Sequence, residues 1–139
     1  MTDYMELKKR QQEEVNNFPM FFAFNNKQFK EGMEKLGLEP GDTNLIYKLG
    51  NTGGYYRRSD AEELYNMFSR HERERQEAIK ADTGEGYCFQ MFKYELANHE
   101  YGYTGRLNDT LEALDLALEE VKNSPQLSRG LKLALEEYR

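Results

Sequence analysis

A chain of 139 residues is long enough to bury a sizeable core, and its 38% hydrophobic content excludes global disorder. The net charge of −6 disfavours long-range attraction to DNA and anionic lipid, although a local basic patch stays open to nucleic acid. The single cysteine, Cys88, excludes an internal disulfide and favours a reducing compartment. No segment resembles a signal peptide or a membrane span. We therefore expect one cytoplasmic domain over residues 1–139.

The N-terminal quarter is predicted to form a helix, a strand and a second helix. Residues 3–17 are rich in helix formers, and Pro19 stops this helix. The apolar run MFFAF predicts a strand near 20–24, buried on both faces and central in any sheet. Asn25 is a typical helix cap, and the helix that it opens is expected to end at Gly37.

A β-hairpin is predicted next. Two runs that favour strands, near 45–49 and 54–58, are joined by the segment GNTGG, whose glycines suit a turn. With the strand near 20–24 they predict a small antiparallel sheet of about three strands. Because the rest of the chain is helical, with a C-terminal third that is all helix, the predicted fold class is α+β.

A long helix is predicted to start at Ser59. Leu64, Tyr65 and Phe68 give its first two turns an apolar face. Its second half, RHERERQEAIK, is charged on nearly every side, and we expect it to project into solvent or to face a partner. The helix over 87–99 has the widest apolar surface, and we expect it to be the most buried and to cover the sheet.

The C-terminal third shows helical periodicity throughout. The apolar stripe over 109–123 fits one helix or two short helices broken near Asp115, and periodicity leaves both open. Ser124 followed by Pro125 predicts the start of the last helix, since proline at the first helical position loses no hydrogen bond.

No motif indicates catalysis or metal binding. The stretch LGNTGGYYRR lacks the Gly-Lys-Ser/Thr of a phosphate loop. Glu95 and His99 share a helix face, but zinc sites use three or four ligands, and His71 is expected to be solvated. Cys88 is expected to pack as a small hydrophobe. We therefore expect a protein that is not an enzyme, with no catalytic residue, no metal and no cofactor.

The charge pattern suggests where a partner binds. Residues 43–58 carry three bases and no acid, whereas residues 59–82 and 107–139 are each predominantly acidic. Tyr and Arg are frequent binding hot spots and also suit unpaired RNA. The alternative is that Tyr47 and Tyr55 are core residues and that the arginines are solvated or paired with helix acids. The candidate partner-binding residues are Lys48, Tyr55, Tyr56, Arg57 and Arg58 in the hairpin, and Arg70, Glu72, Arg73, Glu74 and Glu77 in the charged helix.

Three segments carry a family resemblance: FPMFFAFNNKQFKEGMEKLGL, GGYYRRSDAEEL and YELANHEYGYTGRLNDTLEALDLALEEV. They resemble a family of small acidic proteins carried on plasmids and conjugative elements of low-GC Gram-positive bacteria. Mobile elements of this kind also carry inhibitors of CRISPR immunity, and the chain is similar in kind to type II anti-CRISPR proteins. The resemblance implies a setting and a class of partner, and it implies no catalytic residues.

Three hypotheses follow for the function. The first is a non-enzymatic inhibitor that binds a type II CRISPR effector nuclease or blocks assembly with its guide RNA. The second is an accessory regulatory or structural module that binds another element-encoded protein or forms a homodimer. The third is a small RNA-binding protein that uses the basic hairpin. None of the three involves a membrane.

Overall fold

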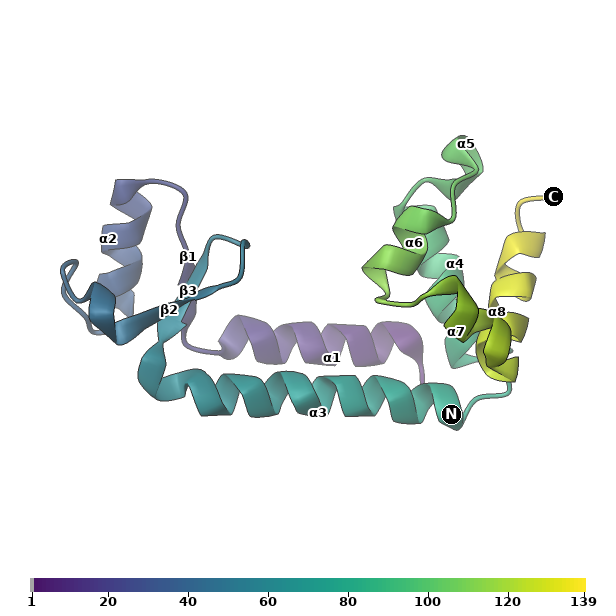
Figure 1. Cartoon of the computed structure of the whole chain (residues 1–139), viewed down its shortest axis with the longest axis horizontal. Coiled ribbons are helices and arrows are strands. Elements are labelled where there is room, and N and C mark those ends of the chain that lie inside the picture. Colours follow the sequence, from purple (N-terminus) through teal and green to yellow (C-terminus); the bar gives the residue numbers. More distant parts are fainter. Residues whose placement is uncertain (1) are drawn as a thin grey trace. The chain divides into compact units, whose positions relative to one another are not determined.

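The computed structural model describes residues 2–139, which form eight α-helices and one three-stranded antiparallel sheet (Figure 1). This confirms the α+β class. Contacts divide these residues into two compact units, whose boundaries fall inside the helices α1 (Tyr4–Asn17) and α3 (Ala61–Lys80). We call Glu13–His71 the sheet unit, and the residues up to Gln12 together with Glu72–Arg139 the helical unit. The expectation of one domain stays a prediction.

The strand order in the sheet unit is β1-β3-β2. β3 (Gly54–Arg57) is central and pairs antiparallel with both β1 (Met20–Phe22) and β2 (Ile46–Leu49). The prediction that the first strand is central was therefore wrong. Three residues of its apolar run are buried, Met20 in one core and Phe21 and Ala23 in the other, while two phenylalanines are exposed. The run therefore does not reflect a position between two other strands.

The hairpin between β2 and β3 is confirmed, with a loop of four residues. Gly50 and Gly53 have φ values of 53° and 81°, in the left-handed region that glycine adopts without strain. The Thr52 hydroxyl donates to the carbonyl of Leu49 at 2.6 Å and accepts from the amide of Gly54 at 3.1 Å. The glycines of this stretch thus serve the turn, as its sequence predicts.

Helices that lie close to the strands in the sequence cover both faces of the sheet. α2 (Asn26–Lys35) packs on one face, and Asn25 caps it by accepting from the amide of Gln28 at 2.8 Å. The other face packs on Leu64 and Met67 of α3 and on the residues that end α1. The prediction that the helix over 87–99 covers the sheet was wrong, because that helix belongs to the helical unit.

The long helix α3 begins at Ala61, after a 3₁₀ turn over Arg58–Asp60, and not at Ser59. Its buried residues in the sheet unit include Leu64 and Met67. Tyr65, expected on the apolar face, is 72% exposed. The periodicity predicted the helix correctly. The residue that is buried together with Leu64 is Met67, however, and not Tyr65.

α4 (Tyr87–Asn98) is the central element of the helical unit, where it packs most extensively on α8 (Pro125–Glu136). Its buried side chains confirm the prediction that it is the most buried helix. The short helices α5 (Tyr101–Thr104), α6 (Asn108–Ala113) and α7 (Leu118–Asn123) complete the unit.

The ends of these helices follow local chemistry. Asp115, at φ 54°, separates α6 from α7, so the stripe over 109–123 forms two helices. Ser124 caps α8 by accepting from the amide of Leu127 at 3.2 Å. The Asp82 carboxylate accepts from the amides of Gly84 and Cys88 at 3.0 and 2.9 Å. Burial disfavours this carboxylate, but amide donors outweigh burial and lower its pKa.

Cys88 lies fully buried in α4, which confirms its packing role. Burial, and then the Asp82 charge, raises the pKa of its thiol to about 12. Because the folded pKa is raised, the thiol's contribution to stability is complete at neutral pH and is lost as the pH rises above about 9. We expect iodoacetamide at pH 8 to label Cys88 only after denaturation, as measured by mass spectrometry. Rapid labelling of the native protein would contradict the burial.

Within residues 2–139, no helix is both long enough and apolar enough to cross a membrane.

Candidate functional site

Aromatic side chains and one arginine stay exposed around the hairpin of the sheet unit. Phe22, Phe24 and Tyr47 are 50%, 77% and 43% exposed. Tyr56 is half-buried beside them, and Arg58 is exposed. We call these five residues the hairpin surface. A group of exposed aromatic residues on so small a unit is typical of a binding surface.

Strand pairing positions the centre of this surface. Tyr47 lies directly opposite Tyr56 in the ladder, with 5.9 Å between ring centroids. The guanidinium carbon of Arg58 lies 4.5 Å from the centroid of the Tyr47 ring, and Arg58 Nε donates to the carbonyl of Ile46 at 3.3 Å. This bond holds the guanidinium over the ring while its terminal nitrogens remain available to a partner.

The glycines at the end of the hairpin leave space for the two phenylalanines. A Cβ atom at Gly53 would lie 2.4 Å from the Phe24 ring, and one at Gly54 would lie 2.9 Å from the Phe22 ring. The amide of Ala23 donates to the carbonyl of Gly53 at 3.0 Å and fixes this segment to the turn. The rings are therefore seated on glycine backbone and stay exposed on their outer sides.

An open pocket of about 320 Å³ lies at the β2 edge of the sheet. We call it the edge pocket. Aromatic and apolar groups form most of its wall, and Thr43 and Lys48 supply polar groups. Lys48 pairs with Tyr55 on the face that α2 covers, whereas Tyr47 pairs with Tyr56 on the other face, so the edge pocket and the hairpin surface lie on opposite faces of the sheet. The lining residues are Phe29, Thr43, Ile46, Tyr47, Lys48 and Tyr55.

The structure separates the predicted hairpin residues into two groups. Tyr55 is a core residue whose ring centroid lies 5.3 Å from that of Phe21. Arg57 donates to the Asp60 carboxylate at 2.8 Å and to the carbonyl of Leu36 at 3.3 Å. Both side chains therefore make contacts that stabilise the fold. Lys48 is exposed and makes no ion pair within the described part of the chain, as a partner-binding residue should.

The charged half of α3 contacts α1 of its own chain. In the sheet unit Arg70 pairs with Glu14, and this hydrogen bond is the main reason that the pKa of Glu14 falls to about 2. His71 is 3% exposed and its Nε2 lies 3.4 Å from the same carboxylate, so the expectation of a solvated histidine was wrong. The sequence of α3 alone does not show that α1 supplies a carboxylate for Arg70 and His71.

The other candidates on α3 follow the same trend in the helical unit. Glu74 accepts from Arg10 at 2.9 Å, and Glu72 pairs with Arg75 at 2.5 Å. Arg73 and Glu77 are exposed. The expectation that this half of the helix projects into solvent or faces a partner was thus wrong for the residues that pair with α1. The role of the α3 candidates in partner binding stays a prediction.

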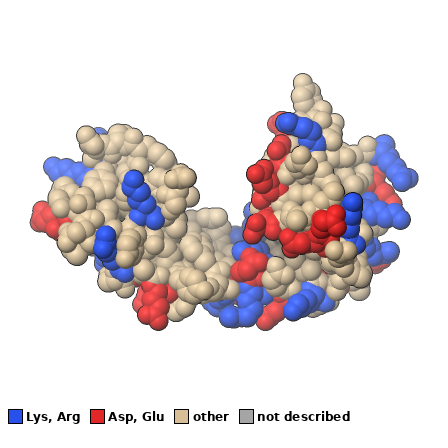
Figure 2. All heavy atoms as spheres, in the orientation of Figure 1, with Lys and Arg blue, Asp and Glu red and all other residues tan. Residues whose placement is uncertain are grey.

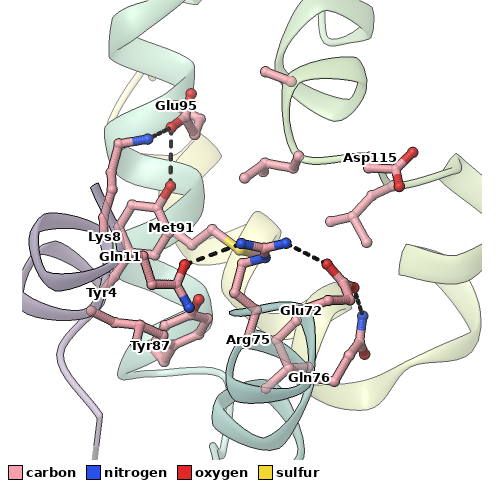
Figure 3. Close-up of a pocket in the computed structure, with 15 residues that line it drawn as sticks. Tyr4, Lys8, Gln11, Glu72, Arg75, Gln76, Tyr87, Met91, Glu95 and Asp115 are labelled. Carbon is pink, nitrogen blue, oxygen red and sulfur yellow. Dashed lines mark hydrogen bonds and ion pairs between the residues drawn. The ribbon is translucent and has the colours of Figure 1, made fainter. Parts of the chain in front are cut away.

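A polar cavity of about 330 Å³ lies in the helical unit (Figure 3). At one end the buried Glu95 carboxylate accepts from the Tyr4 hydroxyl at 3.0 Å and from Lys8 Nζ at 3.2 Å. At the other end Arg75 lies between Gln11, at 3.1 Å, and Glu72. Each cation in the cavity is therefore engaged by a neighbouring acid, and the polar groups link helices to one another.

Burial, and then the Glu95 charge, raises the pKa of Tyr4 above its ordinary value, so its hydroxyl keeps the proton that it donates. His99 Nε2 lies 3.4 Å from Glu95, as the predicted pair requires. Among residues 2–139, no three His, Cys, Asp or Glu side chains gather in a way that could hold a metal ion. The cavity is therefore best described as an internal polar link between α1, α3 and α4.

Charge is distributed differently on the two units. On the face shown in Figure 2, the sheet unit presents mainly uncharged surface with separate basic and acidic side chains, and more acidic side chains gather on the helical unit. The acids near α6 and α7 include Glu112, Asp115, Glu119 and Glu120. This agrees with the charge pattern along the sequence.

The sequence model of DUF7659, a family of unknown function, matches residues 3–137. The chain belongs to this family. The match to DUF7659 includes the hairpin surface, the edge pocket and the polar cavity. No curated protein and no solved structure matches the chain.

Sequence reasoning missed Phe22, Phe24 and the exposure of Tyr47 as candidate binding residues. An apolar run of five residues was interpreted as a buried strand, whereas β1 has three residues and Phe24 lies beyond it. The signal available in the sequence was the pair of glycines at 53 and 54, which suit close approach of a ring to the backbone. That signal was assigned to the turn alone.

Proposed function

We propose that the protein is a non-enzymatic binding protein that inhibits a type II CRISPR effector nuclease, or its assembly with guide RNA, by docking through the hairpin surface. The observation that carries the docking surface is the exposure of three aromatic residues around the hairpin, Phe22, Phe24 and Tyr47, with Arg58 over the Tyr47 ring. Aromatic residues and arginine contribute most of the energy at many interfaces. The choice of effector comes from the resemblance to proteins of mobile elements.

The internal pairing of charges supports action by binding. Glu95, the most buried carboxylate of the polar cavity, accepts from Tyr4 and Lys8 through Oε1, and His99 Nε2 lies 3.4 Å from its Oε2, so groups of the chain itself lie at both oxygens. A catalytic group would need a reacting atom within hydrogen-bond reach. Docking through rings and a guanidinium needs no such group.

The charge distribution supports electrostatic steering of this docking. Residues 43–58 carry Lys48, Arg57 and Arg58 and no acid, so all acids lie elsewhere on the chain. The basic side of such a molecule turns toward negative surface, which raises the association rate at low salt. A ribonucleoprotein, in which RNA is exposed beside protein, offers a partner of this kind.

The test is a DNA-cleavage assay with a type II effector, with the protein added before or after guide RNA. We expect inhibition at micromolar protein and a loss of about 30- to 700-fold in potency for the double variant Phe24→Ala/Tyr47→Ala, since each ring is worth about 1–2 kcal/mol at a hot spot. Tyr103→Ala is the matched control, because Tyr103 is 92% exposed but lies in the helical unit. Unchanged cleavage with the wild-type protein would overturn the proposal, as would full potency of the double variant.

A second candidate is an accessory module that binds another protein. The observation that favours it is the pair Tyr65 and Phe68 on α3, which are 72% and 38% exposed outside the hairpin surface. Light scattering and co-purification with the tagged chain test it. Recovery of a stable partner that Tyr65→Ala releases, with no effect on effector cleavage, would favour this candidate over the first.

A further inference from the structure

We propose that the outer edge of β2 binds an extended acidic segment of a partner protein, which adds a fourth strand to the sheet. This inference deepens the proposed function, on which it rests, because it shares Tyr47 and Arg58 with the hairpin surface and names the form in which the partner docks. Strand addition requires an edge with unpaired backbone groups and side-chain sites beside that edge. For an acidic segment it also requires cations close to the edge.

The outer edge of β2 is open to solvent. The strand order β1-β3-β2 leaves one side of Ile46–Leu49 without a neighbouring strand. Leu45 and Tyr47 are 45% and 43% exposed, and Lys48 is exposed. Alternate residues of an edge strand direct their amide and carbonyl groups away from the sheet, where another chain can pair with them. Such an edge is a template for an added strand.

Arg58 lies at one end of this edge. Its Nε donates to the Ile46 carbonyl at 3.3 Å, so one backbone acceptor at the start of β2 is engaged. The bond is long and the side chain is exposed, so a carboxylate of a partner can compete for the guanidinium. Within residues 2–139, no side chain bonds to the backbone of Tyr47 or Lys48. These two residues therefore form the open part of the edge.

The edge pocket is the side-chain site on the face that α2 covers. Strand residues alternate between the two faces of a sheet, so every second residue of an added strand points to this side. A residue opposite Ile46 lies at the pocket, which Phe29 and Thr43 also line. The rings of Phe29 and Tyr55, with centroids 5.2 Å apart, give the pocket an aromatic wall. An apolar side chain suits this site.

Tyr47 and Arg58 form the side-chain site on the other face. The guanidinium carbon of Arg58 lies 4.5 Å from the centroid of the Tyr47 ring, and Tyr47 pairs with Tyr56 on this face. A residue opposite Tyr47 points to this side, next to a ring and a cation. One extended segment thus reaches both sites, because its consecutive side chains point to opposite faces of the sheet.

The charges near the edge favour an acidic segment. Lys48 lies on the face of the edge pocket and Arg58 on the other, so an acid on either face of the added strand meets a cation. Residues 43–58 contain no acid that would repel it. Opposite charges directly across two strands stabilise their pairing. The matching segment therefore has an apolar residue opposite Ile46 and acids opposite Tyr47 and Lys48.

The same observations disfavour two other occupants. Pairing of β2 with β2 of a second copy would bring two basic hairpins together, and like charges across strands weaken pairing. Single-stranded RNA matches the charge of Lys48 and Arg58, but it offers no regular row of amide and carbonyl groups to the strand edge. Both occupants are arms of the test.

The test is an NMR titration of the isotope-labelled protein with the peptide Thr-Thr-Glu-Asp-Phe-Thr-Thr, acetylated and amidated at its ends. This order places Phe opposite Ile46 and Glu opposite Lys48 when the peptide runs antiparallel to β2, the more stable direction. We expect the amide signals of residues 45–49 to shift and those of the helical unit to stay unchanged. Single-stranded RNA is titrated in parallel, and light scattering of the protein alone measures its oligomeric state.

A second peptide tests whether the backbone of the ligand takes part. It has the same sequence, with N-methyl groups on its Glu and Asp amides. Because alternate amides of an added strand face β2, one of two adjacent methyl groups always removes a hydrogen bond to the edge. We expect this peptide to bind about tenfold more weakly, although its charge and side chains are unchanged.

The variant Lys48→Glu tests the register. It should weaken binding of the acidic peptide about fivefold to tenfold, and it should prefer the peptide Thr-Thr-Lys-Asp-Phe-Thr-Thr. Lys132→Glu is the matched control, because it makes the same charge change at an exposed position of the helical unit. We expect the control to bind both peptides as the wild-type protein does. Thermal unfolding confirms that each variant is folded.

Several results would overturn this inference: no shift over residues 45–49 at millimolar peptide, equal binding of the N-methylated peptide, or equal weakening by Lys132→Glu. Tighter binding of RNA at the same amides, or a dimer joined through β2, would replace the occupant. Effector inhibition without peptide binding would leave the proposed function standing and remove the strand site. Peptide binding without any effect on the effector would do the reverse.

Discussion

Replacement of Gly130 by alanine is expected to lower the free energy of unfolding of the helical unit by about 3 kcal/mol. A Cβ atom at this position would lie 2.6 Å from Cys88 Cβ and 2.8 Å from the Cys88 carbonyl carbon. Because one of these atoms is backbone, no rotamer change removes the overlap, and α4 and α8 must move apart. An alanine in a helix normally stabilises by about 1 kcal/mol relative to glycine, so the sign itself is informative.

Thermal unfolding measures this effect, and the midpoint should fall by about 15 °C for a unit of this size. Gly41→Ala is the matched control, because a Cβ atom at Gly41 meets nothing within 4 Å and its φ is not positive. We expect the control to unfold within about 2 °C of the wild-type protein. A midpoint for Gly130→Ala equal to or above the wild-type value would show that α4 and α8 are not packed this closely.

Replacement of Gly32 by alanine is expected to destabilise the sheet unit by a similar amount, about 2–4 kcal/mol. Gly32 lies in α2, where an added Cβ would be 2.1 Å from Cδ2 of Phe21. The Phe21 ring has little room to move away from an added Cβ atom, because it is stacked on Tyr55 and packs edge-to-face on Phe29 with centroids 5.7 Å apart. Strain at this point therefore spreads to the wall of the edge pocket.

A double-mutant cycle with Phe21→Leu tests the cause. Each single variant should be destabilised, and the double variant should be more stable than the sum of the two effects predicts, by about 1 kcal/mol or more. Hydrogen exchange resolves the location, since amides of the sheet unit should lose protection before those of the helical unit. Additive effects in the cycle would show that the Gly32–Phe21 approach is not the cause. Equal loss of protection in both units would indicate that the whole chain unfolds as one domain.

Local chemistry in the sequence was enough to predict most elements. Asn25 and Ser124 accept amide hydrogen bonds at the starts of α2 and α8, because short polar side chains cap helices whatever the tertiary setting. The glycines of GNTGG adopt left-handed backbone in the hairpin turn, since only such residues do so without strain. Asp115 was predicted as a potential break, and the structure places a left-handed residue there.

Long-range arrangement was beyond these local rules. The apolar surface of the helix over 87–99 shows that it is buried, but it does not identify what buries it, and α4 packs on α8 instead of the sheet. The charged half of α3 was expected to project into solvent or to face a partner. Nothing local in its sequence shows that Arg70 and Glu74 pair with α1, more than 50 residues earlier in the chain. Pairings across such a separation leave no periodic trace in either helix.

The candidate site was predicted in part. Lys48 and Arg58 lie where the basic hairpin was expected to bind, because the absence of acids in residues 43–58 is visible in the sequence. Tyr55 and Arg57 were candidates on composition alone, and the fold uses both internally. Exposure of Phe22 and Phe24 depends on which strand is central and on the seats provided by Gly53 and Gly54, which composition does not reveal.

The division of the chain into units also sets an order of events during synthesis. The sheet unit is continuous from Glu13 to His71, so all of it is translated before residues 72–139 of the helical unit. The helical unit is discontinuous, because the Tyr4 hydroxyl bonds to Glu95 across 91 residues. Closing that loop is slow and must wait for α4. A nascent chain therefore forms its hairpin early, while the N-terminal half of α1 still lacks the residues of α4 that it contacts in the finished protein.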